Sequence, residues 1–232
     1  MGPGERRVAA IVLAAGAGQR IGDERPKAFL PIGGRPMLAL AVAGAAASSS
    51  FGVVVVTAPA GWEDEARDCI AGCGLPSVVV TGGETRQASV RIALGALDAS
   101  TTIVAIHDAA RPFAAPELFR AVVAAVSPTT PGVVPVVPVT DTVKQVADGR
   151  SRRTLDRDEL AFAQTPQAFD VRVLARAHRQ AAEAGVSLTD DAAALERLGI
   201  GVAVVAGDPG NVKITTALDL AVADSRIGEP HA

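Results

Sequence analysis

Short apolar runs alternate with segments of helical periodicity along most of the chain, and this alternation limits the possible folds more than any other feature. Strand-like runs occupy residues 8–14, 53–57, 78–81, 101–107, 132–139 and 202–206. Helical segments occupy residues 36–47, 61–71, 84–97, 116–126, 171–184 and 216–225. Strands that are apolar throughout are typical of a sheet buried on both faces, and the helices between them supply parallel crossovers. The sequence therefore predicts an α/β fold: a Rossmann-like, mostly parallel twisted sheet with helices on both faces.

One stretch, at about residues 140–160, breaks this alternation. Asp148-Gly149 separates two extended segments, 142–147 and 150–155, and an Asp-Gly pair in this position is a strong signal for a two-residue hairpin. The second segment is very polar, and an isolated hairpin is only marginally stable in water. We therefore expect a protruding β-hairpin arm that packs on a second copy of the chain, with a solvated surface loop as the alternative. The 232 residues otherwise suit a single domain, 1–232.

The charge balance and the residue content exclude several classes of partner. The chain has 22 Lys and Arg against 25 Asp and Glu, a formal net charge of −3, so no general positive field would attract nucleic acid or an anionic membrane. No apolar run approaches the roughly 20 residues of a membrane span, and none resembles a signal peptide. Cys69 and Cys73 have no further metal ligands nearby. We expect a cytoplasmic protein with no nucleic-acid or membrane partner and no metal-ligand set of its own.

A glycine-rich turn follows the first strand-like run. It reads Ala14-Ala15-Gly16-Ala17-Gly18-Gln19-Arg20, and exposed N–H groups in such a turn can hold phosphate oxygens. A dinucleotide fingerprint would need a third glycine near Ile21 and an acid where Thr57 ends the second run, so this motif is absent. The Gly-Lys-Ser/Thr motif of a P-loop is absent as well. The turn instead delivers Arg20 and then Lys27 beside a phosphate cradle, and ligands of such sheets bind at the carboxyl ends of the strands.

Further motifs follow in order along the chain. They are Gly82-Gly83-Glu84-Thr85-Arg86-Gln87-Ala88-Ser89-Val90, His107-Asp108-Ala109-Ala110-Arg111-Pro112, Asp141-Thr142-Val143-Lys144, Asp156-Arg157, Gln164-Thr165-Pro166-Gln167-Ala168-Phe169, Thr189-Asp190-Asp191 and Asn211-Val212-Lys213-Ile214-Thr215. The first half of the chain resembles the nucleotidyltransferases that activate sugars and polyols. The ordered set, from Ala9 to about Ala223, resembles the 2-C-methyl-D-erythritol 4-phosphate cytidylyltransferase family.

That resemblance implies a reaction. The enzyme would transfer the cytidylyl group of CTP to 2-C-methyl-D-erythritol 4-phosphate, releasing pyrophosphate, in the non-mevalonate synthesis of isoprenoid precursors. It implies Mg²⁺ as a cofactor, bound mainly through the CTP phosphates, because such catalysis rests on positioning and charge stabilisation. The alternatives are a cytidylyltransferase for ribitol 5-phosphate or another polyol phosphate, and a non-catalytic nucleotide sensor on the same fold.

The resemblance also implies roles for individual residues of a single nucleotidyltransferase domain. Catalytic roles fall on Arg20, Lys27, Arg157 and Lys213. The CTP-binding set is Ala14, Ala15, Gly16, Gly18, Gly82, Gly83, Arg86, Ser89, Asp108 and Ala109. The set that binds the polyol phosphate is Asp108, Arg111, Thr142, Arg157, Thr165, Thr189 and Lys213. In the family the hairpin arm reaches into the partner subunit of a homodimer, so Arg157 would act in trans.

The remaining titratable candidates are expected to be structural. His107 fits a buried, hydrogen-bonded residue better than a base, because the attacking phosphate is already ionised. His178 and His231 are expected at the surface. Thr189-Asp190-Asp191 resembles a helix N-cap with acids in the first turn.

Overall fold

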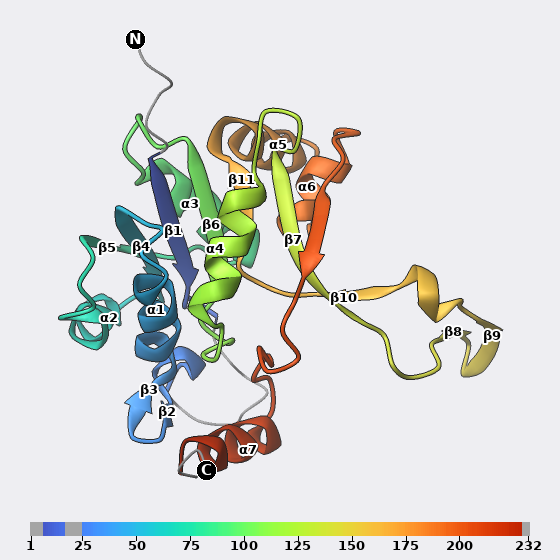
Figure 1. Cartoon of the computed structure of the whole chain (residues 1–232), viewed down its shortest axis with the longest axis horizontal. Coiled ribbons are helices and arrows are strands. Elements are labelled where there is room, and N and C mark those ends of the chain that lie inside the picture. Colours follow the sequence, from blue (N-terminus) through green and yellow to red (C-terminus); the bar gives the residue numbers. More distant parts are fainter. Residues whose placement is uncertain (1–6, 17–24, 229–232) are drawn as a thin grey trace.

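The computed structural model describes residues 7–16 and 25–228, and a mixed eight-stranded sheet runs through the centre of the molecule (Figure 1). Four strands form its parallel part in the order β5-β4-β1-β6. They are β1 (Val8–Leu13), β4 (Val53–Ala58), β5 (Ser77–Thr81) and β6 (Ile103–Asp108). Leu13 pairs with both Thr57 and Asp108, so three strands end level with one another. The predicted parallel sheet is confirmed, and its carboxyl edge is the place to look for a ligand.

An antiparallel part extends the sheet beyond β6. Strand β11 (Gln167–Asp170) runs antiparallel between β6 and β7 (Gly132–Pro138). Strand β10 (Ala161–Ala163) pairs antiparallel with β7, whereas β12 (Ala203–Ala206) pairs with β7 in parallel. The sequence analysis did not predict β10 or β11. Because β11 runs against β6, the residues just before it arrive at the carboxyl end of β6, where Asp108 lies.

Helices cover both faces of the sheet, as predicted. One face carries α1 (Met37–Ala47), α2 (Glu63–Ile70) and α4 (Pro116–Ala125), and the other carries α3 (Arg86–Gly95), α5 (Val171–Glu183) and α6 (Ala192–Glu196). Side chains of a strand alternate between the two faces: Ala10 and Val12 of β1 pack into the first layer, and Ile11 packs into the second. Over residues 7–16 and 25–228, no helix has the length and apolarity needed to cross a membrane.

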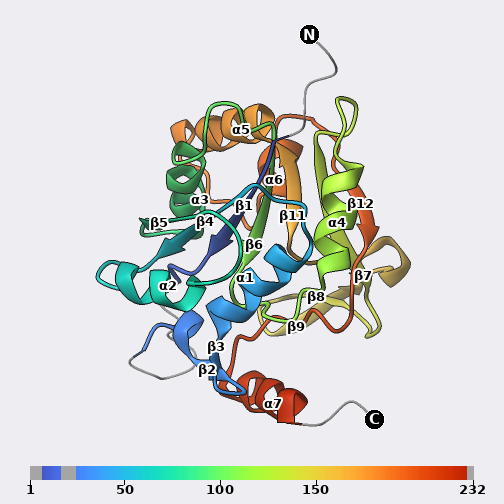
Figure 2. The same ribbon diagram turned by 60° about the vertical axis from the view of Figure 1, so that its left-hand side comes forward.

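The C-terminal segment returns to the start of the chain. Helix α7 (Ala217–Gly228) lies against the small hairpin of β2 (Pro31–Ile32) and β3 (Arg35–Pro36), which follows the short 3-10 helix η1 (Lys27–Phe29) (Figure 2). Ile214 and Ala223 pack there with Ile32 and Met37. The Gly33 N–H donates to Asp224 Oδ1 at 2.7 Å. A side chain at Gly33 would place its Cβ 2.4 Å from Ile227 Cγ2, and its φ of +56° also favours glycine. This packing fixes the Lys27 segment next to the Lys213 segment.

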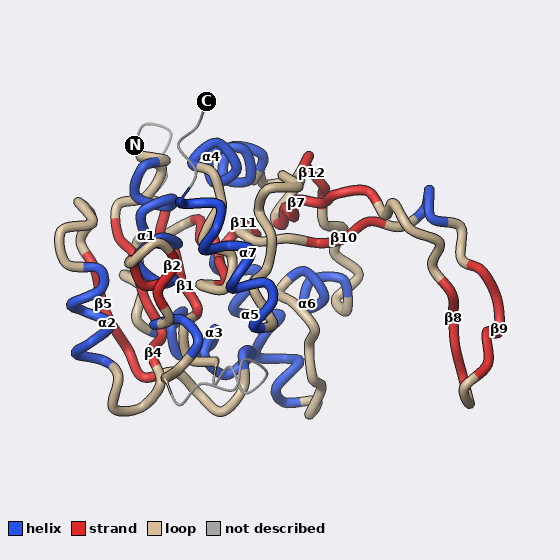
Figure 3. Tube along the Cα trace, turned by 90° about the horizontal axis from the view of Figure 1, so that it is seen from below, coloured by secondary structure: helices blue, strands red, loops and turns tan. Residues whose placement is uncertain are grey.

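The predicted hairpin is confirmed. Strand β8 (Lys144–Ala147) pairs with β9 (Arg150–Thr154) across Asp148-Gly149, whose φ angles of 52° and 70° suit a two-residue turn. All residues of β8 and β9 are exposed. The arm stands clear of the rest of the chain (Figure 3), and the short helix η2 (Arg157–Glu159) follows it. The loop alternative is therefore wrong about the form of this segment.

A reciprocal cap begins α7. The Asp219 N–H donates to Thr216 Oγ1 at 3.2 Å, and the N–H groups of Thr215 and Thr216 both donate to Asp219 Oδ2 at 2.8 Å. This is the capping-box arrangement. The bonds from Thr215 and Thr216 lower the pKa of Asp219 to about 2. The cap therefore anchors the end of the segment that carries Lys213.

We expect Thr216→Ala to lower the free energy of unfolding by about 1 kcal/mol, because it removes an N-cap acceptor. Urea denaturation at neutral pH measures the change. Thr216→Ser keeps the hydroxyl and should unfold close to the wild type. If the alanine and serine variants unfolded at the same urea concentration, the capping role would be wrong.

Candidate active site

A cavity of about 650 Å³ opens at the carboxyl ends of β1, β4 and β6. Its walls come from the ends of these strands and the loops after them, the start of α3, the short helix η1 and the segment before α7. The lining residues are Leu13, Ala14, Ala15, Gly16, Lys27, Ala28, Thr57, Gly83, Glu84, Thr85, Arg86, Ser89, Asp108, Ala109, Ala110, Lys213 and Thr215. The cavity therefore lies where open parallel sheets bind their ligands.

Two glycines let the wall of this cavity close tightly. A Cβ at Gly82 would lie 2.2 Å from Ala15 Cβ, and one at Gly83 would lie 2.5 Å from Ala88 Cβ. The Ser89 hydroxyl accepts from Gly83 N at 3.1 Å and donates to Thr85 O at 3.0 Å, which holds the turn on α3. Any larger residue at these glycines would push the two loops apart, so the pair is required by close backbone approach.

A second cavity, of about 280 Å³, adjoins the first. It shares Arg86, Asp108 and Lys213 with the larger cavity. Its other walls come from the segment before β11 and the loop before α6, with one arginine after β6: Arg111, Ala163, Gln164, Thr165, Gln167, Thr189 and Asp190. A ligand in each cavity would meet the other at the three shared side chains.

Asp108 is the centre of charge at this junction. Its residue is 8% exposed, and its carboxylate accepts from Arg86 Nε at 3.1 Å and from Lys213 Nζ at 2.7 Å. Burial raises the pKa of Asp108, but the two cations outweigh that effect and hold the pKa well below its usual range. Asp108 and Asp191 together raise the pKa of Arg86 against its burial. Asp108 and Arg86 are therefore both charged at neutral pH.

Lys27 approaches the larger cavity from η1. Its Nζ donates to Ile214 O at 2.8 Å, and Ile214 N donates to Ala110 O at 2.8 Å. The C-terminal segment thus links Lys27 to the loop after β6. Two ammonium groups 186 positions apart in the sequence, at Lys27 and Lys213, line one cavity as a result.

His107 organises the loop after β6 from within. Thr165 Oγ1 accepts from Asp108 N at 3.1 Å and lies 3.0 Å from His107 Nδ1, while His107 Nε2 lies 3.0 Å from Arg111 O. Burial lowers the pKa of His107 to about 4. A neutral ring that accepts from Thr165 at Nδ1 and donates to Arg111 at Nε2 satisfies every one of these contacts. The geometry supports the structural role expected from the sequence.

Most of the expected site residues come together. The larger cavity gathers Ala14, Ala15, Gly16, Lys27, Gly83, Arg86, Ser89, Asp108, Ala109 and Lys213, with Gly82 packed behind Ala15. Arg111, Thr165 and Thr189 line the smaller cavity. Gly18 and Arg20 lie outside the described residues. Thr142 and Arg157 are on the exposed arm and line neither cavity, and Arg157 Nη1 donates to Thr140 O at 2.7 Å.

The prediction that His178 lies at the surface is wrong. It is 1% exposed, on the face of α5 that also buries Leu174 and Ala177, and its Nε2 lies 2.9 Å from Asp191 Oδ1. The helical spacing of these three positions was the available signal. His231 lies outside the described residues.

The expectation that Thr189-Asp190-Asp191 forms an N-cap with acids in the first helical turn is wrong, because α6 begins only at Ala192. Asp191 directly precedes the helix, but its side chain makes no capping bond. Instead Asp190 Oδ1 accepts from Ala193 N at 3.0 Å. Asp191 is fully buried and pairs with Arg86 Nη2 at 2.7 Å. Sequence reasoning assigned no role to this pairing, nor to the buried amides of Gln164, Gln167 and Asn211.

Sequence comparison places the chain in one family. The family model described as 2-C-methyl-D-erythritol 4-phosphate cytidylyltransferase matches residues 8–229. The enzyme of that name from Streptomyces coelicolor is 44% identical over 230 residues, covering 94% of this chain and 84% of that protein. The one from Nostoc punctiforme is 39% identical over 218 residues, covering 92% and 95%.

Solved structures give the same result. The 4-diphosphocytidyl-2C-methyl-D-erythritol synthase of Anaerococcus prevotii superposes with a TM-score of 0.86 at 29% identity, covering 97% of this chain and 99% of that one. The 2-C-methyl-D-erythritol 4-phosphate cytidylyltransferase of Thermus thermophilus gives 0.78 at 34% identity, covering 95% and 98%. Because the family model matches residues 8–229 of its 232, this chain belongs to the 2-C-methyl-D-erythritol 4-phosphate cytidylyltransferase family.

Proposed function

We propose that the larger cavity binds CTP and the smaller one binds the polyol phosphate, so that the two react at the junction beside Asp108. As a member of its family, the chain is a CTP-dependent nucleotidyltransferase of the non-mevalonate route. It transfers the cytidylyl group to 2-C-methyl-D-erythritol 4-phosphate and releases pyrophosphate. The observation that carries the assignment of the cavities is that they share Arg86, Asp108 and Lys213.

The walls of the larger cavity suit a nucleotide. Backbone N–H groups after β1 can hold phosphate oxygens, and the tight turn at Gly82-Gly83 offers backbone contacts to the cytosine ring. We place the triphosphate near Lys27. We also assign Gly18 and Arg20, in the glycine-rich turn after β1, to the binding of the nucleotide. Ser89 holds the turn that faces the base.

The smaller cavity suits a short polyol phosphate. Thr165 and Thr189 bring hydroxyl groups for the polyol, and Arg111 and Lys213 bring positive charge for the phosphate. The Arg111 guanidinium is held by Asn211 O at 2.7 Å and Ala163 O at 3.3 Å. Both of these hydrogen-bond partners are uncharged carbonyl groups, so the guanidinium can still bind an anion.

The chemistry is one displacement at phosphorus. An oxygen of the polyol phosphate forms a bond to the α-phosphorus of CTP, the bond to the bridging oxygen of the β-phosphate breaks, and pyrophosphate leaves with the electron pair. Since the attacking phosphate is already ionised, no general base is required. Lys27, Arg20 and Lys213 stabilise the negative charge that builds on the transferred phosphoryl group, and preorganised cations of this kind supply most of the catalysis.

The described residues suit Mg²⁺ that arrives with the nucleotide. Among them, no group of three or more His, Cys, Asp or Glu side chains could enclose a metal ion. Asp108 already bonds Arg86 and Lys213. Mg²⁺ held mainly by phosphate oxygens is its common mode in such enzymes, and it would neutralise part of the triphosphate charge.

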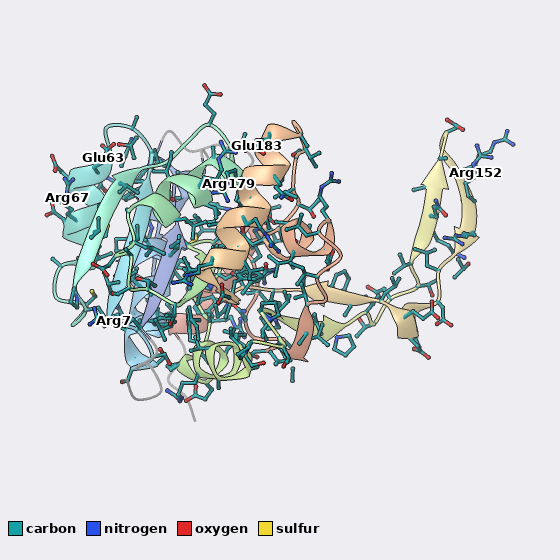
Figure 4. The ribbon with its side chains drawn as sticks, turned by 90° about the horizontal axis from the view of Figure 1, so that it is seen from above. Arg7, Glu63, Arg67, Arg152, Arg179 and Glu183 are labelled. Carbon is teal, nitrogen blue, oxygen red and sulfur yellow. The ribbon has the colours of Figure 1, made fainter. Side chains whose placement is uncertain are left out.

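The arm is proposed as the contact of a homodimer. Val146, near the tip of the arm, is 68% exposed, and Phe162 of β10, just after the arm, is 58% exposed. Exposed apolar side chains of this size favour a protein partner. We propose that residues at about 140–160 reach a second copy of this single-domain chain, so that Thr142 and Arg157 complete the partner's smaller cavity. Arg152 points outward near the tip of the arm (Figure 4).

Purified protein with CTP, Mg²⁺ and 2-C-methyl-D-erythritol 4-phosphate should release pyrophosphate, measured by a coupled phosphate assay. Ribitol 5-phosphate, supplied separately and in competition, should give the lower kcat/KM. A folded protein that bound CTP without turnover would be a nucleotide sensor and would contradict the proposal. Preference for ribitol 5-phosphate would reassign the smaller cavity to another polyol phosphate.

Lys27→Ala should lower kcat about 100-fold or more, because one preorganised charge at the transition state is worth about 3 kcal/mol. Arg179→Ala, on the exposed side of α5 (Figure 4), removes a cation remote from both cavities and should keep wild-type kinetics. Steady-state kinetics and the thermal unfolding midpoint are compared for both variants. A kcat for Lys27→Ala within a few-fold of wild type would exclude the proposed role.

Arg157→Ala should chiefly raise the KM for the polyol phosphate. Mixing Arg157→Ala with Lys27→Ala chains tests the crossing of the arm, because a mixed dimer would hold one complete site: Lys27 from one chain and Arg157 from the other. Random mixing makes half of the dimers mixed, each with one complete site of two. At a polyol phosphate concentration too low for the Arg157→Ala parent to turn over, activity should therefore recover to about a quarter of wild type. Mixed dimers, verified by mass, that stay as inactive as the parents would show that the arm acts within its own chain.

A further inference from the structure

A row of charged and polar side chains continues from the active site into the interior of the protein. Arg86 binds Asp108 through Nε at 3.1 Å and lies 2.7 Å from Asp191 Oδ2 through Nη2. Asp191 Oδ1 in turn lies 2.9 Å from His178 Nε2. Neither Asp191 nor His178 lines either cavity. The row therefore begins at the junction of the two cavities and ends at Asp191 and His178, which lie outside both cavities.

Burial makes this arrangement costly as a purely structural device. The side chains of Asp191 and His178 are 0% and 2% exposed. In the part of the chain that the structure describes, His178 Nδ1 is buried without a hydrogen-bond partner. Apolar residues of similar volume are often at least as stabilising as a buried ionic group. Stability alone gives little reason for His and Asp at these positions, which points to a role in placing Arg86.

The geometry shows how Arg86 is placed. A guanidinium is planar, with its donors in a fixed fork. Ion pairs at Nε and at Nη2, each with a different carboxylate, leave the group little freedom to turn. Burial raises the pKa of Asp191, but Arg86 and the His178 hydrogen bond outweigh it and keep the pKa below its usual range. The ionised carboxylate is acceptor-only, so His178 donates from Nε2.

Neighbouring contacts keep Asp191 itself in place. Gln167 Nε2 donates to Asp190 Oδ2 at 2.9 Å, and Gln167 Oε1 accepts from Ala192 N at 3.2 Å. Thr189, in the same segment of the chain as Asp190 and Asp191, lies in the wall of the smaller cavity. The position of Asp191 is thereby tied both to Arg86 and to the substrate wall.

We infer that Asp191 and His178 are positioning residues, a buried pair that holds the Arg86 guanidinium at the junction and through it sets the Asp108 carboxylate and Lys213. This inference rests on the proposed assignment of the two cavities. Asp108 and Asp191 balance the charges of Arg86 and Lys213. Loss of the Asp191 charge leaves Arg86 mobile and one positive charge in excess beside two anionic ligands.

Asp191→Asn tests this directly, since it keeps the shape and removes the charge. We expect kcat to fall by about 10- to 100-fold, because small misplacements of charged groups are costly for catalysis. The KM for CTP, and its Kd by calorimetry, should stay equal or fall, because the excess positive charge attracts the triphosphate. Asp64→Asn, at an exposed ion pair with Arg67 on α2, is the matched control and should leave kcat and KM unchanged.

Variants of His178 give a second, independent test, which still applies if Asp191→Asn fails to fold. His178→Gln keeps an N–H donor at the same reach and should retain most of the turnover. His178→Leu removes the donor and should lower kcat in the direction of Asp191→Asn. Combining His178→Leu with Asp191→Asn should add little, because both act on one guanidinium.

Several results would overturn the inference. They are a kcat of Asp191→Asn within twofold of wild type, a raised Kd for CTP in that variant, or equal kcat for His178→Leu and His178→Gln. Wild-type enzyme is the positive control and Lys27→Ala is the negative control for each of these measurements, and the same two proteins test the proposed function. If wild type lacked activity, the assignment of the cavities would fail, whereas CTP calorimetry on Asp191→Asn would still decide the placement of Arg86.

Discussion

The buried carboxylate of Asp108, bonded to Arg86 and Lys213, is the interaction on which the rest of the site depends. It joins the end of β6, the first turn of α3 and the C-terminal segment at one point. The chain carries a net charge of −3, so it can bring two anions together only by concentrating cations locally. A buried anion at the centre of those cations offsets their mutual repulsion and fixes their direction.

The fold creates this point by three separate means. Parallel strands end level, so the loops after β1, β4 and β6 share one cavity. Antiparallel β11 delivers Thr165 to the same edge, where its hydroxyl joins Asp108 and His107. The packing of α7 on the β2–β3 hairpin brings Lys27 and Lys213 to one wall. Substrate binding and charge placement therefore depend on contacts between segments far apart in the sequence.

Sequence reasoning predicted the elements that have a local sequence signal and missed the contacts between residues far apart in the sequence. The parallel strands follow from runs such as Val53–Ala58, and the arm follows from Asp148-Gly149, because each signal lies within a few residues. Strands β10 and β11 have only three and four residues and lack the β-branched valines that mark the equally short β12. The pairing of Arg86 with Asp191 joins residues 105 positions apart, and no local rule indicates it. Mg²⁺, the dimer, the cytoplasmic location and the roles of the individual site residues stay predictions.

A crystal structure of the protein with CTP and Mg²⁺ tests the central claim most directly. Our account predicts the cytosine ring against Gly82-Gly83 and the α-phosphate at the junction of the two cavities, within contact distance of Lys27 and beside the Asp108–Lys213 pair. A nucleotide whose phosphates lay outside both cavities, with Lys27 and Lys213 turned away from it, would contradict the account.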